Sequence, residues 1–134
     1  MPVIVEAVTQ PSAQDRSDLE KIYADAPAWL LAPYPDAAAL IDAGLAESRL
    51  LAGRFNDRLL GAALLGEGEA GCMLSHLCVR RITRGRGVAA RLVAKARERA
   101  EAAGRPLHLL APARHLEVQA WAHRLGLPLL DQDA

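Results

Sequence analysis

The sequence predicts an α/β fold in which a mixed sheet is flanked by helices. Two observations support this prediction. First, short apolar segments alternate with longer segments of helical periodicity in the order β-α-α-β-β-β-α-β-α-β. Second, the three central strands are joined by short turns and should pair antiparallel, whereas a helix separates the later strands, which should pair in parallel. At 134 residues, the chain is expected to form a single domain over residues 1–134.

The bounds of each element follow from periodicity and from breaker residues. Ser12 can cap a helix in which Leu19 and Ile22 share one face, and the charged residues, Asp18 among them, are expected to face solvent. Asn56-Asp57 tolerates positive φ and predicts a hairpin turn. A loop is expected at the prolines 27, 33 and 35. The predicted strands are 3–8, 49–55, 58–65, 72–80, 107–111 and 127–130, and the later helices are 36–47, 87–103 and one that ends at Gly126.

The composition is that of a globular protein, with charge separated along the chain. Hydrophobic residues make up 51% and charged residues 24%, and the formal net charge is zero. Residues 1–78 carry five basic and eleven acidic side chains, whereas residues 79–104 carry eight basic and two acidic ones. The chain has five aromatic residues in total, none in this basic segment, so the segment does not resemble a nucleic-acid-binding surface. It favours a small anionic ligand instead.

Nothing in the sequence indicates a metal site, a disulfide or a membrane anchor. Cys72 and Cys78 are the only cysteines; six residues apart on one predicted strand, they are expected on the same face as buried, reduced thiols. No apolar run approaches the ~18 residues of a membrane span, and the N-terminal segment lacks the pattern of a signal peptide. We therefore expect a cytoplasmic protein.

The segment Leu77–Val93 carries the main functional signal. It predicts a strand, a tight loop and a helix, and the loop contains Arg84-x-x-Gly87-x-Ala89. Gly87 lacks a Cβ that would keep a ligand from the backbone, and the first N–H groups of the following helix have no intrahelical partner. Such a helix start binds phosphate or pyrophosphate. The segment matches neither a P-loop nor a dinucleotide-binding fingerprint.

This motif, placed after a strand that ends in Leu-x-Val, resembles the acyl-CoA pyrophosphate loop of the GCN5-related N-acetyltransferase (GNAT) superfamily. The order of elements along the whole chain also resembles the GNAT fold. The resemblance implies acetyl-CoA, or CoA, as the ligand. Ala89 stands where the family often has glycine, and Gly85 where a larger residue could sit. The residues that the resemblance assigns to the cofactor are Leu77, Cys78, Val79, Thr83, Arg84, Gly85, Arg86, Gly87, Val88, Ala89 and Ala90.

Three stretches are similar to a smaller branch of that superfamily, the PanZ (PanM) family of aspartate 1-decarboxylase maturation factors. They are Ser12–Tyr23, Arg54–Leu60 and Val79–Val88. The resemblance implies that the chain binds acetyl-CoA and then associates with the aspartate decarboxylase (PanD) proenzyme. By the same resemblance, this association is expected to promote the self-cleavage that creates the pyruvoyl cofactor, and so to regulate β-alanine supply for pantothenate and coenzyme A biosynthesis. Asn56, Arg80 and Arg81 are the expected partner contacts.

Residues for acetyl transfer are incomplete. An active enzyme commonly needs a base for the acceptor amine and an acid for the departing CoA thiolate. In many GNAT proteins the acid is a tyrosine four residues before a Gly-Phe pair. Here the matching pair is Gly126-Leu127 and the residue at that distance is Ala122, which cannot donate a proton. His76 is the candidate base because of its ordinary pKa, although a lone histidine beside apolar residues is more often structural.

The remaining candidates favour structural roles. The spacing of Trp121 predicts core packing, and His115 and His123 are expected to be solvated. The leading hypothesis is therefore a non-catalytic partner protein that depends on acetyl-CoA. Two alternatives stay open: a true N-acetyltransferase of a small amine or a protein N-terminus, which uses His76 or a water as base, and a CoA-binding module with a different partner.

Overall fold

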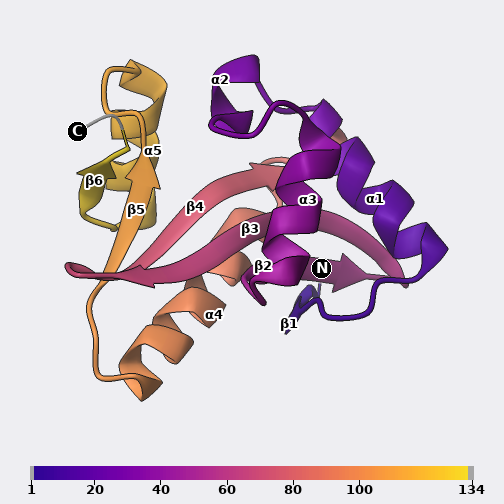
Figure 1. The fold of residues 1–134 in the computed structure, drawn as a ribbon, viewed down its shortest axis with the longest axis horizontal. Helices are drawn as coiled ribbons and strands as arrows, with labels where there is room; N and C mark the ends of the chain where they lie inside the picture. Colours follow the sequence, from indigo (N-terminus) through magenta and orange to yellow (C-terminus); the bar gives the residue numbers. More distant parts are fainter. Residues whose placement is uncertain (1, 133–134) are drawn as a thin grey trace.

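A computed structural model of the chain describes residues 2–132. Its elements are β1 (Ile4–Ala7), α1 (Ala13–Ala24), α2 (Ala28–Leu31), α3 (Ala37–Ala46), β2 (Leu50–Phe55), β3 (Arg58–Gly68), β4 (Gly71–Val79), the 3-10 helix η1 (Arg81–Thr83), α4 (Val88–Ala102), β5 (Leu107–Ala111), α5 (Leu116–Leu125) and β6 (Leu129–Asp131). The six strands form one sheet in sequence order (Figure 1). β1 to β4 pair antiparallel, and β5 pairs in parallel with both β4 and β6, so the predicted mixed sheet is confirmed.

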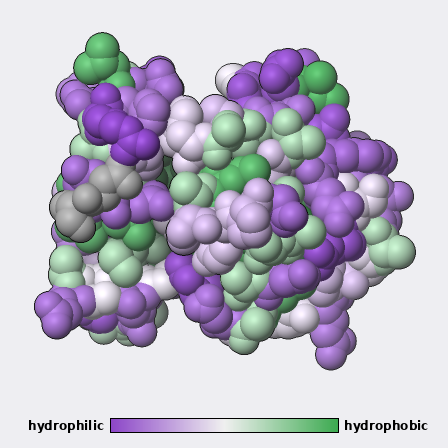
Figure 2. Space-filling model, turned by 45° about the horizontal axis from the view of Figure 1, so that its top comes forward, coloured by the Kyte–Doolittle hydropathy of each residue, from purple (hydrophilic) through white to green (hydrophobic). Residues whose placement is uncertain are grey.

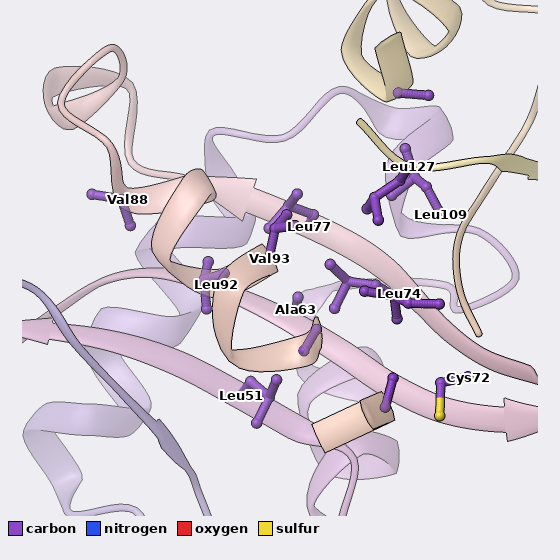
Figure 3. Packing of buried hydrophobic residues seen from close by; sticks show 14 of the residues in the cluster. Leu51, Ala63, Cys72, Leu74, Leu77, Val88, Leu92, Val93, Leu109 and Leu127 are labelled. Atoms are coloured by element: carbon purple, nitrogen blue, oxygen red, sulfur yellow. The ribbon is translucent and has the colours of Figure 1, made fainter. Parts of the chain in front are cut away.

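Hydrophobic cores lie on both faces of the sheet. On one face, Leu92 of α4 packs with Leu74 of β4 in the cluster drawn in Figure 3. On the other face, Leu19 of α1 packs with Leu40 of α3. All four side chains are fully buried, and full burial of a leucine contributes about 1.5–3 kcal/mol. The sheet is thereby held between two helical layers.

The packing of α4 fixes where this helix begins. Val88, its first residue, is 1% exposed. It approaches β3 so closely that a Cβ at Gly61 would lie 2.8 Å from the Val88 Cγ1. The start of α4 is therefore anchored against the sheet beside the end of β4.

Two short elements were not predicted. α2 and η1 lie where the sequence indicated only loops, because a single turn of helix is too short to show periodicity. Pro27, with φ of −65°, precedes the first residue of α2 and fixes a backbone angle suited to the helix start. β3 also extends to Gly68, three residues past its expected end, and β6 begins at Leu129, two residues after its expected start.

A bulge in β4 displaces the side chains that follow it. Ala62 of β3 pairs with Cys78 of β4, and Leu64 pairs with Ser75. Between these two pairs, β3 has one residue and β4 has two. His76, inside the bulge, has φ of 53°. An extra residue in one strand shifts the alternation of its side chains by one position.

The expectation that the two cysteines share a face is therefore wrong. Cys72 belongs to the core under α4, and Cys78 to the core under α1 and α3. The same shift places Leu74 and Leu77, three residues apart, in one core. Both cysteines are buried free thiols.

The expectation that Asp18 faces solvent is also wrong. Its side chain is 1% exposed and accepts hydrogen bonds from Arg58 at 2.7–3.0 Å and from the Leu59 amide at 3.1 Å. Arg54 makes a similar pair with Asp15 at 3.0 Å. These ion pairs fasten the β2–β3 hairpin to α1, so that two of the stretches singled out in the sequence contact each other.

Between residues 2 and 132, no helix combines the length and apolar character needed to cross a membrane. Within the same range, no three His, Cys, Asp or Glu side chains come together in a way that could hold a metal ion.

Candidate functional site

A cavity of about 480 Å³ opens at the end of β4. β4 pairs with β5 only from Cys72 to Leu74, and its continuation to Val79 leaves that side of the strand without a β5 partner. The start of α4, the α2 segment and α5 form the other walls. Figure 2 shows the molecule hollowed between the C-terminal part, on the left, and the rest of the chain.

The loop between β4 and α4 presents bare backbone to this cavity. Gly85 and Gly87 have φ of 80° and 86°, which other residues rarely adopt. A Cβ at either position would meet no heavy atom within 4 Å, so the space above the loop is open. Glycine is therefore required by the backbone conformation and not by a lack of space. A larger residue at Gly85, which the GNAT pattern permits, would be strained here. Gly87 caps α4 without any side-chain hydrogen bond, and the N–H groups of the first turn are left available for an anion.

Arg84 holds this loop in place. Its Nε donates to the Val79 carbonyl and its Nη2 to the Asp25 carbonyl, both at 3.1 Å. The Asp25 carboxylate accepts from the Arg81 amide at 2.9 Å and from Arg80 Nε at 3.2 Å. The Arg81 hydrogen bond lowers the pKa of Asp25, burial opposes this effect, and Arg80 adds to it. The end of α1 is thereby fastened to the loop between β4 and α4.

Most of the predicted cofactor residues line the cavity, and Arg86 is the exception. Sequence reasoning missed the other walls, which are formed by Pro27, Trp29 and Leu30 near α2 and by Glu117, Trp121, Arg124 and Leu125 on α5. The spacing of Glu117, Trp121 and Arg124 does place them on one helix face. It could not show that this face borders a cavity.

Comparison with known families decides the classification. The family model described as "Acetyltransferase (GNAT) domain, PanZ" matches residues 2–128. The chain belongs to the PanZ family of GNAT domains. A search of curated proteins found no match.

Solved structures share the fold of this PanZ-family chain. The PaiA N-acetyltransferase of Thermoplasma acidophilum, in complex with coenzyme A, is 14% identical with a TM-score of 0.67, over 92% of this chain and 88% of its own. A GCN5-related N-acetyltransferase from Kribbella flavida is 20% identical with a TM-score of 0.57, over 78% and 29%. A Bacillus anthracis protein in complex with acetyl coenzyme A is 18% identical with a TM-score of 0.52, over 57% and 45%. The chain thus spans less than half the length of the last two proteins, and the likeness establishes the GNAT fold.

His76, the candidate base, does not line this cavity. Its Nε2 lies 2.9 Å from the Ala32 carbonyl, which can only accept, so Nε2 carries the proton. Nδ1 then accepts from the Ser75 hydroxyl at 2.8 Å. Burial lowers the pKa of His76, the bond to Ala32 opposes this, and the charge of Arg49 lowers it further. Both ring nitrogens are engaged within the fold.

Two other groups at positions relevant to acetyl transfer are unreactive. Ala122, at the family's acid position, is 5% exposed and carries only a methyl group. The Cys78 thiol donates to the Ile22 carbonyl at 3.3 Å. Burial raises the pKa of Cys78 to about 11, so the thiol remains protonated at neutral pH and is a poor nucleophile.

The structure corrects the expected exposure of His115, and it gives Trp121 a place in the cavity wall in addition to the expected core packing. His115 is not fully solvated: its ring stacks on Trp29, with centroids 4.4 Å apart and an interplanar angle of 19°. Trp121 is only partly buried, and it lines the cavity while packing against both cores. For His115 the reason is α2, which supplies the facing ring of Trp29. His123 is exposed as expected.

The expected partner contacts lie at the same end of the sheet. Asn56 forms the exposed hairpin turn, with φ of 49°. The Arg80 amide donates to the Leu60 carbonyl, which places it beside the start of β3. Arg81 is exposed, whereas Arg80 is half-buried in its ion pair with Asp25.

Proposed function

We propose that this PanZ-family chain binds acetyl-CoA in the cavity between β4 and α5. The residues that line this cavity fit acetyl-CoA. The start of α4 suits a pyrophosphate because the glycines before it carry no side chain and have open space above them, and residues 83–90 would hold that part. The end of β4 has no β5 partner, and Leu77, Cys78 and Val79 would hold the amide-rich pantetheine arm along that side of the strand. The volume of about 480 Å³ lies within the roughly 300–1,000 Å³ typical of ligand pockets.

In this proposal the bound acetyl-CoA is a ligand and not a substrate. The observation that carries it is the combination of an open phosphate loop with Ala122 at the acid position. Release of CoA needs a proton donor for the thiolate, and a methyl group cannot supply one. His76, with both ring nitrogens engaged, is also badly placed to accept a proton from an amine.

The acetyl-CoA-bound chain would associate with the aspartate decarboxylase proenzyme and promote its self-cleavage. It can do so by binding the proenzyme conformer in which a serine hydroxyl is placed to attack the preceding carbonyl, which raises the population of that conformer. Acetyl-CoA controls this step only if it and the proenzyme each tighten binding of the other. The hairpin turn at Asn56 and the exposed Arg81 are the surfaces we assign to this contact.

The test is cleavage of purified aspartate decarboxylase proenzyme, followed by mass spectrometry, with and without this chain and with and without acetyl-CoA. Rapid cleavage that requires both would support the proposal. Absence of acceleration, with acetyl-CoA binding confirmed by calorimetry, would contradict the maturation role. Release of CoA thiol on addition of an amine, lost in His76→Ala, would favour the alternative of an active N-acetyltransferase.

A further inference from the structure

Two arginine side chains line the cavity, and they differ in how they are engaged. Arg84 already bonds to the carbonyls of Val79 and Asp25. Arg124 lies on α5, which forms a different wall. Across residues 2–132 it has no hydrogen bond or ion pair with another side chain or carbonyl. An unpaired guanidinium that borders a cavity is available for an anion.

Arg97 explains why Arg124 is left free. An arginine in the last turn of a helix commonly bonds to the final carbonyls of that helix. Here the carbonyls of Leu125 and Gly126 accept instead from Arg97 Nη2, at 3.1 and 2.8 Å. Arg97 therefore fastens the end of α5 to α4 and occupies the carbonyls of the two residues that follow Arg124.

The carboxylate on the same wall does not neutralise Arg124. Glu117 lies seven residues earlier on α5, about 10 Å along the helix axis. Its carboxylate is 3.8 Å from His115 Nδ1, at the opposite end of the helix. Arg124, an exposed residue on the cavity wall, thus has no paired carboxylate among residues 2–132.

We propose that Arg124 binds a second phosphate group of the cofactor, the monoester on the ribose, and that Arg97 is a positioning residue for it. This inference rests on the proposed binding of acetyl-CoA. That cofactor carries a pyrophosphate and a 3′-phosphate on one nucleotide, and the start of α4 can satisfy only one of the two. The fork of a guanidinium fits a phosphate monoester through two parallel hydrogen bonds. Arg124 would therefore favour acetyl-CoA over the otherwise identical ester that lacks the 3′-phosphate.

Calorimetric titration with acetyl-CoA and with acetyl-3′-dephospho-CoA tests this inference. The wild-type chain should bind acetyl-CoA about tenfold more tightly, the effect of one charge-assisted contact. Arg124→Gln should remove this preference by weakening acetyl-CoA alone, with the dephosphorylated ester unchanged within about twofold. Arg91→Gln, an exposed α4 substitution outside the cavity lining, should keep the preference. Arg97→Gln should reduce it, and should add nothing in the Arg124→Gln background.

Equal weakening of the binding of both esters by Arg124→Gln would overturn the inference. The side chain would then contact the pyrophosphate, or would hold the α5 wall of the cavity in place. Unchanged binding of both esters would overturn it as well. In either case the proposed binding of acetyl-CoA would stand. Failure of the wild-type chain to bind either ester would overturn the proposed function and this inference together.

Discussion

Asp18 lies buried beneath Arg58, whose Nη2 is 2.7 Å from the Asp18 Oδ1. The carboxylate also accepts from the Leu59 amide at 3.1 Å and from Gln14 at 2.9 Å. One acidic side chain of α1 thus holds the first residues of β3, and with them the hairpin that carries Asn56. The geometry of the expected partner surface depends on this charged pair.

Asp18→Asn should therefore destabilise the fold. The substitution keeps the shape and removes the charge, and we expect a loss of about 2 kcal/mol in the free energy of unfolding, as for hydrogen bonds to a charged group. Urea denaturation measures it. Glu20→Gln, on the exposed side of the same helix, is the control and should change stability by less than about 0.5 kcal/mol. Equal effects of both substitutions would contradict a special role for the buried pair.

Three carboxylates should make the fold sensitive to acid. The hydrogen bond from Arg54 lowers the pKa of Asp15, and the Arg81 amide lowers that of Asp25. Burial raises the pKa of Asp18, but bonds from Arg58 and its other donors outweigh this. A lowered folded pKa adds stability that is present above the unfolded value of about 4 and is lost as the pH falls through the folded value. Chemical denaturation between pH 5 and 2 should show this loss, with a smaller slope in Asp18→Asn.

His76 should make the stability depend on pH in a higher range. Its folded pKa is lowered, so below about pH 6.5 the unfolded chain binds a proton that the folded chain does not. The free energy of unfolding should therefore fall as the pH drops from 7 to 5. His76→Gln should flatten this dependence, while His123→Gln, at an exposed position, should retain it. An unchanged slope in His76→Gln would show that the buried ring does not carry the effect.

Gly104 is a matched control for Gly87, which lies in the proposed phosphate-binding loop. Both have positive φ, 86° and 69°, and an added Cβ would meet nothing within 4 Å at either position. Alanine at either site should cost roughly 1–2 kcal/mol of stability through backbone strain. Only Gly87→Ala should also weaken acetyl-CoA binding, since Gly87 alone of the two lines the cavity. Thermal unfolding and calorimetric titration separate the two effects, and equal affinities would contradict the assigned loop.

Arg84 and Arg86 should respond differently to removal. Arg84→Ala should lower both the stability and the affinity for acetyl-CoA, because its guanidinium ties the loop to Val79 and Asp25. Arg86→Ala should weaken binding in a salt-dependent way and leave the unfolding temperature unchanged, since Arg86 is exposed. Full affinity in the double alanine variant would argue against cationic assistance at this loop.

The two thiols should be unreactive in the native chain. Both are buried, and the pKa of Cys78 is raised to about 11. An aromatic disulfide reagent at pH 8 should therefore modify neither thiol until the chain is unfolded in guanidinium, after which both should react. Rapid native modification of one thiol would contradict the burial of that side chain.

Local patterns predicted the elements that the structure confirms. The hydrophobic spacing of α1, α3, α4 and α5 depends on residues close in sequence, and the Gly-rich loop before α4 is defined by conformational needs that only glycine meets easily. The mixed sheet followed from the connections alone. The family resemblance rested on stretches of consecutive residues, and the family match confirms it.

The bulge, the burial of Asp18 and the walls of the cavity depended on the tertiary structure. The alternation of β4 predicted one face for Cys72 and Cys78, and the extra residue at His76 reversed it, because pairing with β3 sets the register. The charge of Asp18 predicted exposure, and only the approach of Arg58, forty residues away, makes its burial favourable.

The sequence by itself thus determined the order of the six strands and the four longer helices, the Gly-rich loop before α4 and the alanine at position 122, since each is a property of neighbouring residues. The tertiary structure decided which faces meet: α2 against α5, Arg97 against the end of α5, and Arg124 toward the cavity. These contacts join residues distant in the chain, and their geometry is set by packing across the sheet rather than by local preference.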